Sequence, residues 1–85
     1  MAYAAIYSDE ALSFLKKLDN KEGERILDKI DGSLAEPEHF FKRLVGREEF
    51  RLRIGDFRAI ARILKNEQKV FIISIGHRKN VYEKK

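Results

Sequence analysis

The 85-residue chain contains no cysteine and no tryptophan, a single proline, and no long run of apolar residues. The lack of cysteine excludes disulfide scaffolds, thiol catalysis and cysteine-based zinc sites, and it leaves the redox compartment undetermined. No apolar stretch approaches the roughly 20 residues that a membrane-spanning helix needs. Because residues 1–7 lack the basic start and longer apolar stretch of a signal peptide, we expect a cytoplasmic protein with no membrane partner.

Several motifs that carry catalysis are also missing. The chain has no glycine-rich loop followed by Lys-Ser/Thr and no G-x-S-x-G motif. His39 and His77 are its only histidines, and neither has an acidic cluster beside it at the spacing of a metal site. We therefore expect neither a metal nor a cofactor.

The composition is that of one compact domain covering residues 1–85. Hydrophobic residues make up 44% and charged residues 38% of the sequence, which is typical of a folded chain. A chain of this length buries roughly 60–65% of its unfolded surface around one core. There are no repeats, no low-complexity segments and no domain linker.

Charge is distributed unevenly along the chain. Residues 1–41 contain five basic and nine acidic side chains, whereas residues 42–85 contain thirteen basic and five acidic ones. Seven of the eight arginines belong to the second segment. This split indicates either an anionic partner on one side of the molecule, with nucleic acid the first candidate, or a solvated surface rich in ion pairs, and charge alone does not choose between them.

The first half of the chain predicts a strand and two helices. Residues 3–7 are apolar and partly β-prone, and Ser8 then fits the N-cap of a helix. Helical spacing of apolar residues predicts a second helix over 21–34, which Pro37 ends. Residues 38–47 form a connecting loop in this interpretation, with three apolar residues beneath it: Phe40, Phe41 and Leu44.

The second half predicts three strands, at 49–54, 57–64 and 70–75. The last is apolar on both faces, which is typical of a strand that has neighbours on either side and is covered on both faces. The element order is therefore β-α-α-β-β-β. We expect an α+β domain in which a two-helix hairpin packs on a small, mostly antiparallel sheet of four strands.

Strands 49–54 and 57–64 form a tight hairpin around Gly55-Asp56, where a glycine at the first central position suits a type II′ turn. A two-residue loop fixes the register, so that Arg53 faces Arg58. Because side chains alternate, Arg51 lies on the same face as these two. Like charges directly opposite each other destabilise a strand pair by up to about 1 kcal/mol, which an anionic ligand would reverse.

The segments FRLRIGDFR and ISIGHRKNVY, which follow Leu44-Val45-Gly46 and a two-helix half, resemble the RelE/ParE superfamily of toxin–antitoxin systems. The resemblance covers nearly the whole chain. It implies the RelE fold, with a curved sheet similar to that of microbial ribonucleases. For the RelE branch it further implies a ribosome-dependent, metal-independent endoribonuclease that cleaves mRNA by attack of the ribose 2′-hydroxyl on the adjacent phosphate.

The resemblance also implies a site. Arg51, Arg53 and Arg58 would bind phosphate and stabilise the transition state, since arginine does not give up its proton at neutral pH. Arg78 would stabilise charge on the leaving group, and Tyr82 would accept the proton of the 2′-hydroxyl. His77, whose unperturbed pKa is near ~6.5, is the alternative acid or base.

Two partners follow from the same resemblance. A RelB-like antitoxin would bind the toxin in a heteromeric complex, and the ribosome would present mRNA in its A site. The alternative is a ParE-like toxin that inhibits DNA gyrase by binding and cleaves nothing. A third class, a non-toxic RNA-binding module, would give no response in assays of either activity.

Overall fold

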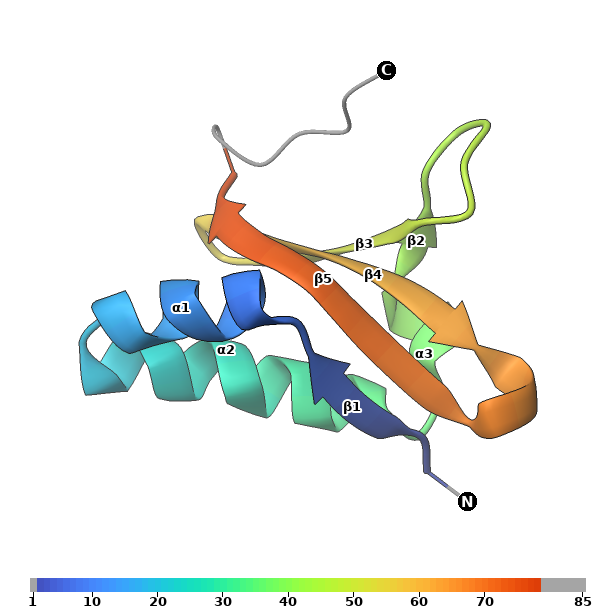
Figure 1. Ribbon diagram of the computed structural model, residues 1–85, viewed down its shortest axis with the longest axis horizontal. Helices are drawn as coiled ribbons and strands as arrows, with labels where there is room; N and C mark the ends of the chain where they lie inside the picture. The colour runs from blue at the N-terminus through green and yellow to red at the C-terminus, as the bar shows by residue number, and fades with distance from the viewer. Residues whose placement is uncertain (1, 79–85) are drawn as a thin grey trace.

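The structure is a computed structural model that describes residues 2–78 of the chain (Figure 1). It contains a five-stranded sheet and three helices. In chain order the elements are β1 (Ala4–Tyr7), α1 (Asp9–Lys17), α2 (Asn20–Ser33), α3 (Pro37–Phe40), β2 (Lys42–Arg43), β3 (Phe50–Ile54), β4 (Phe57–Leu64), the 3-10 turn η1 (Lys65–Glu67) and β5 (Lys69–His77).

The sheet has the strand order β1-β5-β4-β3-β2. β1 pairs with β5 in parallel, and the other neighbours are antiparallel. Helices α1 and α2 run side by side across one face of the sheet (Figure 1). The predicted α+β class and the predicted helix pair packed on a mostly antiparallel sheet are therefore confirmed, with one strand more than expected.

Side-chain caps begin both long helices. Ser8 Oγ accepts a hydrogen bond from the backbone N–H of Ala11 at 3.0 Å, and the Asp19 carboxylate accepts one from Glu22 at 2.9 Å. Each cap satisfies a backbone donor that the first helical turn leaves without a partner. The prediction that Ser8 is an N-cap is confirmed.

The segment 38–47 departs from the predicted loop. Because Pro37 suits the first turn of a helix, a short helix, α3, forms there, and the two-residue strand β2 follows and pairs with β3. Phe41 and Leu44 are buried as predicted, at 2% and 7% exposure. Phe40 is 40% exposed, so the prediction that it packs beneath the loop is wrong.

Strand β5 lies between β1 and β4, as its apolar sequence predicted. Its core face is buried, with Val70 and Ile72 fully covered, but Phe71 and Ile73 on or near the other face are only half-buried. No helix among residues 2–78 covers that second face, so the prediction of cover on both faces is wrong. We call this face, which no helix of residues 2–78 covers, the open face.

The hairpin of β3 and β4 has the predicted register. Arg53 is paired with Arg58 and Ile54 with Phe57 across the two-residue turn. Gly55 has φ +57°, and Asp56 is not among the residues with positive φ, as a type II′ turn requires. None of the described helices is both long and apolar enough to cross a membrane.

Candidate nucleic-acid interface

Five cations of strands β2, β3 and β4 share the open face of the sheet. Directly opposed residues of an antiparallel pair point to the same side, and alternation along each strand then assigns the rest. Arg53 is opposite Arg58, and Lys42 is opposite Arg51. We call the resulting set the basic face: Lys42, Arg51, Arg53, Arg58 and Arg62.

The cations of the basic face differ in how firmly the fold fixes them. Arg51 and Arg58 are half-buried, and the Nε atom of Arg58 is buried from solvent. Arg53 is exposed at the end of β3. In the neighbouring strand β5, Gly76 lies opposite Arg58 and has no side chain that could cover the arginine. The face therefore combines a half-buried arginine at its centre with an exposed one beside it.

Arg78 lies at the same end of the sheet. It follows β5, and its backbone N–H donates a hydrogen bond to the carbonyl oxygen of Asp56 at 2.8 Å. This bond ties the residue to the β3–β4 turn, close in the fold to Arg53 and Arg58. The side chain of Arg78 is exposed. The structure thus brings Arg53, Arg58 and Arg78 to the turn end of the sheet, with Arg51 two residues before Arg53 in β3. Tyr82 lies outside the described residues.

His77 is placed on the opposite face. It pairs with Phe57, a core residue, and its ring centroid lies 5.0 Å from that of Phe57 and 6.0 Å from that of Phe14 in α1. The adjacent Gly76, not His77, faces Arg58. The structure therefore does not bring the imidazole together with the arginines. The other histidine, His39, lies in α3 with its ring edge-on to Phe40.

Sequence reasoning missed two members of the basic face. Arg62 could have been found, because it has the same parity as Arg58 along β4. Lys42 could not have been found from the sequence, because its position depends on β2, and a strand of two residues has no periodicity to detect. Both residues widen the cationic surface beyond the predicted trio.

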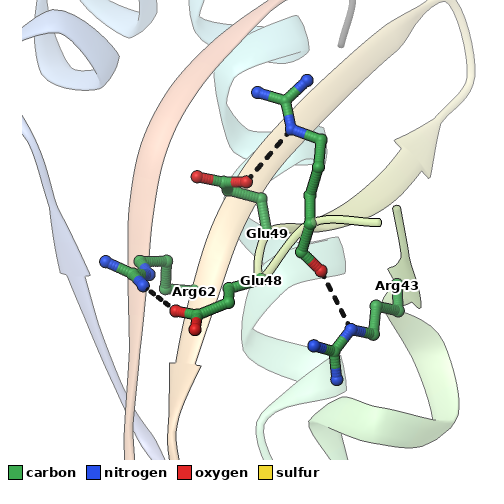
Figure 2. A network of polar contacts seen from close by, with 5 residues as sticks. Arg43, Glu48, Glu49 and Arg62 are labelled. Carbon is green, nitrogen blue, oxygen red and sulfur yellow. Dashed lines mark hydrogen bonds and ion pairs between the residues drawn. The ribbon is translucent and has the colours of Figure 1, made fainter. Parts of the chain in front are cut away.

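A polar network fastens the loop between β2 and β3 to the sheet, and Figure 2 shows its contacts. Arg62 in β4 forms an ion pair with Glu48, and Arg47 forms one with Glu49 at 3.3 Å. Arg43 Nε donates to the Arg47 carbonyl oxygen at 2.9 Å. Such exposed pairs contribute only about 0–1 kcal/mol each, so their main effect is to neutralise Arg62 and orient the loop.

Two pKa shifts lie away from the basic face. Burial, and then the charge of Asp31, raises the pKa of Tyr7 to about 12. A hydrogen bond to Glu38, with Nζ 3.0 Å from the carboxylate oxygen, raises the pKa of the exposed Lys65. Neither residue belongs to the basic face, although Lys65 lines a cleft together with Arg62.

The arrangement is suited to binding phosphate. Guanidinium forks bind phosphate oxygens in pairs and hold charge that develops on them. The four arginines do not serve as a base at neutral pH. Among residues 2–78 no group of three or more His, Cys, Asp or Glu side chains is arranged to hold a metal ion.

Solved structures with the same fold are toxins of toxin–antitoxin systems. The toxin in the RelBE2 complex of Mycobacterium tuberculosis matches with TM-score 0.80 and 26% identity, over 92% of this chain and 100% of that one. The toxin in the intact E. coli RelBE complex matches with TM-score 0.75 and 25% identity, over 98% and 100%. The archaeal RelE–RelB complex of Pyrococcus horikoshii, at 24% identity and TM-score 0.78 over 95% and 100%, supports the fold alone.

The fold and the basic face thus define a small toxin-like domain of the RelE type. Residues 5–82 match the family model described as the ParE toxin of the type II toxin–antitoxin system parDE. The chain belongs to this family, within the RelE/ParE superfamily. No curated protein sequence matches it.

Proposed function

We propose that this toxin is a RelE-like endoribonuclease that cleaves mRNA on the ribosome. The observation that carries the proposal is the placement of Arg51, Arg53 and Arg58 on one face, with the last two directly opposed. Opposed like charges destabilise a strand pair, and a bound phosphodiester reverses that repulsion. The similarity to RelE toxins adds support.

The reaction we propose is an internal transesterification. The ribose 2′-oxygen attacks the adjacent phosphorus and loses its proton to a base, the bond to the 5′-oxygen breaks, and that oxygen gains a proton. The products are a 2′,3′-cyclic phosphate and a 5′-hydroxyl. Negative charge grows on the phosphoryl oxygens in between, where preorganised cations are most effective. The side chains suffice for this scheme, so no metal is part of it.

Each arginine has a role in the proposal. Arg53 and Arg58 hold the two non-bridging oxygens, with Arg51 binding a neighbouring phosphate, while Arg78, fixed to the hairpin turn, stabilises the departing 5′-oxygen. Tyr82 is the proposed proton acceptor. His77 is the weaker alternative, because its ring packs against Phe57 on the other face of the sheet.

Gyrase inhibition without cleavage is the second candidate function. The observation that favours it is the family model, which is described by a ParE toxin. The cationic face fits an RNA phosphodiester chain, and its two half-buried arginines are better prepared for a reacting phosphate than for a flat protein surface. We therefore rank the nuclease first.

The proposal includes two partners and a place of action. A RelB-like antitoxin forms a heteromeric complex with the toxin, as in the structures of RelE toxins with their RelB partners. The mRNA is cut in the ribosomal A site, which puts the activity in the cytoplasm. Co-expression with the neighbouring gene product, followed by size exclusion, tests the first partner, and separate elution of the two chains contradicts it.

The deciding experiment is primer extension on a reporter mRNA in a translation extract. We would compare the wild type with Arg58→Ala, Tyr82→Phe and the control Lys17→Ala, which removes an exposed cation from α1. The proposal expects cleavage with wild type and control, and a loss of about 100-fold or more in the Arg58 variant.

Other outcomes of this experiment have definite meanings. Cleavage that survives in Tyr82→Phe removes the tyrosine as base and leaves the nuclease intact. Absence of cleavage by the wild type, together with loss of gyrase supercoiling, establishes the ParE-like alternative. If neither assay responds, both toxin activities are excluded.

A further inference from the structure

A second group of cations lies around the hairpin turn and shares Arg53 with the basic face. A cleft of about 420 Å³ separates helix α2 from the end of β3. Three cations and one carboxylate line it, together with the turn glycine: Arg25, Lys29, Arg53, Asp28 and Gly55. The cleft therefore has a surplus of positive charge.

The guanidinium of Arg25 lies directly against the turn. A methyl group built on Gly55 would lie 2.8 Å from Nη2 of Arg25, closer than such contacts occur. The missing side chain thus lets a cation from α2 approach the hairpin. Strand β2 pairs only with Phe50 and Arg51, so this end of β3 has no neighbouring strand on its outer edge within the described residues.

Folding alone does not explain this arrangement. Arg25 and Lys29 are four residues apart on a helix, a spacing at which like charges destabilise the helix. Asp28 lies between them, yet within residues 2–78 neither cation nor Arg53 forms an ion pair or hydrogen bond in the structure. Three side chains with unused donors surround one cleft.

We propose that this cleft binds a second phosphate of the RNA, so that the strand runs from the basic face around the hairpin turn onto α2. The inference rests on the proposed function and extends it, because it gives the direction of the strand beyond the reacting phosphate. Arg53 belongs both to the basic face and to the lining of the cleft, so the two cationic surfaces are continuous.

The test compares short and long RNA. Fluorescence anisotropy would measure binding of a labelled trinucleotide and a labelled dodecanucleotide, each with 2′-methoxy riboses so that neither is cleaved. Arg25→Gln and Lys29→Gln are each expected to weaken dodecamer binding about fivefold and to reduce the slope of log K against log salt by about 0.7. Trinucleotide binding is expected to stay unchanged.

Matched variants separate the cleft from general charge. Lys17→Gln removes an exposed cation of α1 that does not line the cleft and is expected to change neither RNA's affinity. Arg25→Lys keeps the charge and is expected to retain the salt slope while losing part of the affinity, since a guanidinium binds phosphate in a forked geometry. Circular dichroism confirms that each variant is folded.

Three results would overturn the inference. The first is equal affinity and salt slope for wild type and Arg25→Gln on the dodecamer, and the second is no RNA binding by the wild type. The third is an acidic peptide of equal charge that binds as tightly and loses affinity in the same variants, which would make the cleft a protein-binding site. Ribosomal cleavage, measured separately by primer extension, reports on the proposed function whatever these results are.

Discussion

At the scale of single residues, the two opposed arginines of the hairpin are not equivalent. The stem of Arg58 is fixed by folding, since its Nε is buried, whereas Arg53 is exposed. Ordering an exposed long side chain on binding costs about 0.5–1.5 kcal/mol. Folding has already ordered Arg58, so more of its interaction with the phosphate is available to the reaction.

This difference predicts unequal losses of activity. Arg58→Ala is expected to lower the cleavage rate about 100-fold or more, and Arg53→Ala about tenfold, because the second side chain is ordered only when RNA binds. Single-turnover cleavage on programmed ribosomes measures both. A larger loss of cleavage rate in Arg53→Ala than in Arg58→Ala would show that burial does not determine which arginine contributes more.

Tyr7 predicts a pH dependence of stability. Its pKa is about 12 in the folded protein, raised chiefly by burial, and ~10 when unfolded. Below pH 10 the Tyr7 hydroxyl keeps its proton in both the folded and the unfolded state, so the stability that Tyr7 contributes is fully present. Between pH 10 and 12 only the unfolded state releases it, so the free energy of unfolding falls as pH rises.

Urea denaturation at pH 8, 9.5 and 11 checks this expectation. Tyr7→Phe has no proton to release, so its stability should fall less steeply over the alkaline range than that of the wild type. Other groups titrate in the same range, and the difference between the two proteins isolates Tyr7. Parallel pH profiles would contradict the prediction.

At the scale of elements, replacing a glycine is expected to have opposite effects on stability in the hairpin turn and in helix α2. Gly55 has φ +57°, a conformation in which a methyl group is strained, so Gly55→Ala is expected to destabilise the protein by about 1–2 kcal/mol. Gly32 is inside α2, and a methyl group there meets nothing within 4 Å, so Gly32→Ala should stabilise by about 0.5–1 kcal/mol. Thermal and urea unfolding of both variants test these two predictions. Changes of the same sign in the free energy of unfolding would refute them.

The start of helix α1 is stabilised by two hydrogen bonds of one side chain, Ser8. Ser8 caps the helix, and its hydroxyl donates to the Ile73 carbonyl oxygen at 2.5 Å, at the irregularity in β5. Ser8→Ala removes both bonds and is expected to cost about 2 kcal/mol, whereas Asp19→Ala removes one exposed cap and should cost about 1 kcal/mol. Chemical denaturation compares the two, and a larger cost at Asp19 would be contrary to expectation.

The elements that the sequence predicted are those with strong local signals. The register of Arg53 with Arg58 follows from a two-residue turn, and the cap at Ser8 follows from the polar residue before a helical pattern. Strand β2 and helix α3 are too short for periodicity to show. In the candidate site, the side of the sheet taken by His77 depends on the β5 irregularity, which shifts the pairing between Ile60 and Ala61 and which no sequence pattern marks.

At the scale of the whole molecule, the basic face is built entirely from residues after position 41, the segment in which the sequence concentrates its arginines. Helices α1 and α2 on the other face come from the acidic first segment. The basic face therefore gives the molecule a cationic surface that attracts nucleic acid and orients its approach.

This polarity predicts a strong dependence of RNA binding on salt. Four cations of the basic face remain once Arg62 is set aside for its pair with Glu48. If each neutralises one phosphate, log K falls against log salt with a slope of about −3 for single strands. Anisotropy between 50 and 200 mM salt should then show roughly a 50-fold loss of affinity, and a flat response would exclude phosphate contacts as the main source of binding.

The order of the strands has a consequence for synthesis. β1 opens the chain, yet its partner in the sheet is β5, and β5 also supports the β3–β4 hairpin. Until translation has passed residue 77, the nascent polypeptide lacks the strand that joins the two parts of the sheet. A ribosome making this chain therefore carries an unfinished sheet until β5 has been synthesised, so the strands of the basic face gain their support only after His77 has been added.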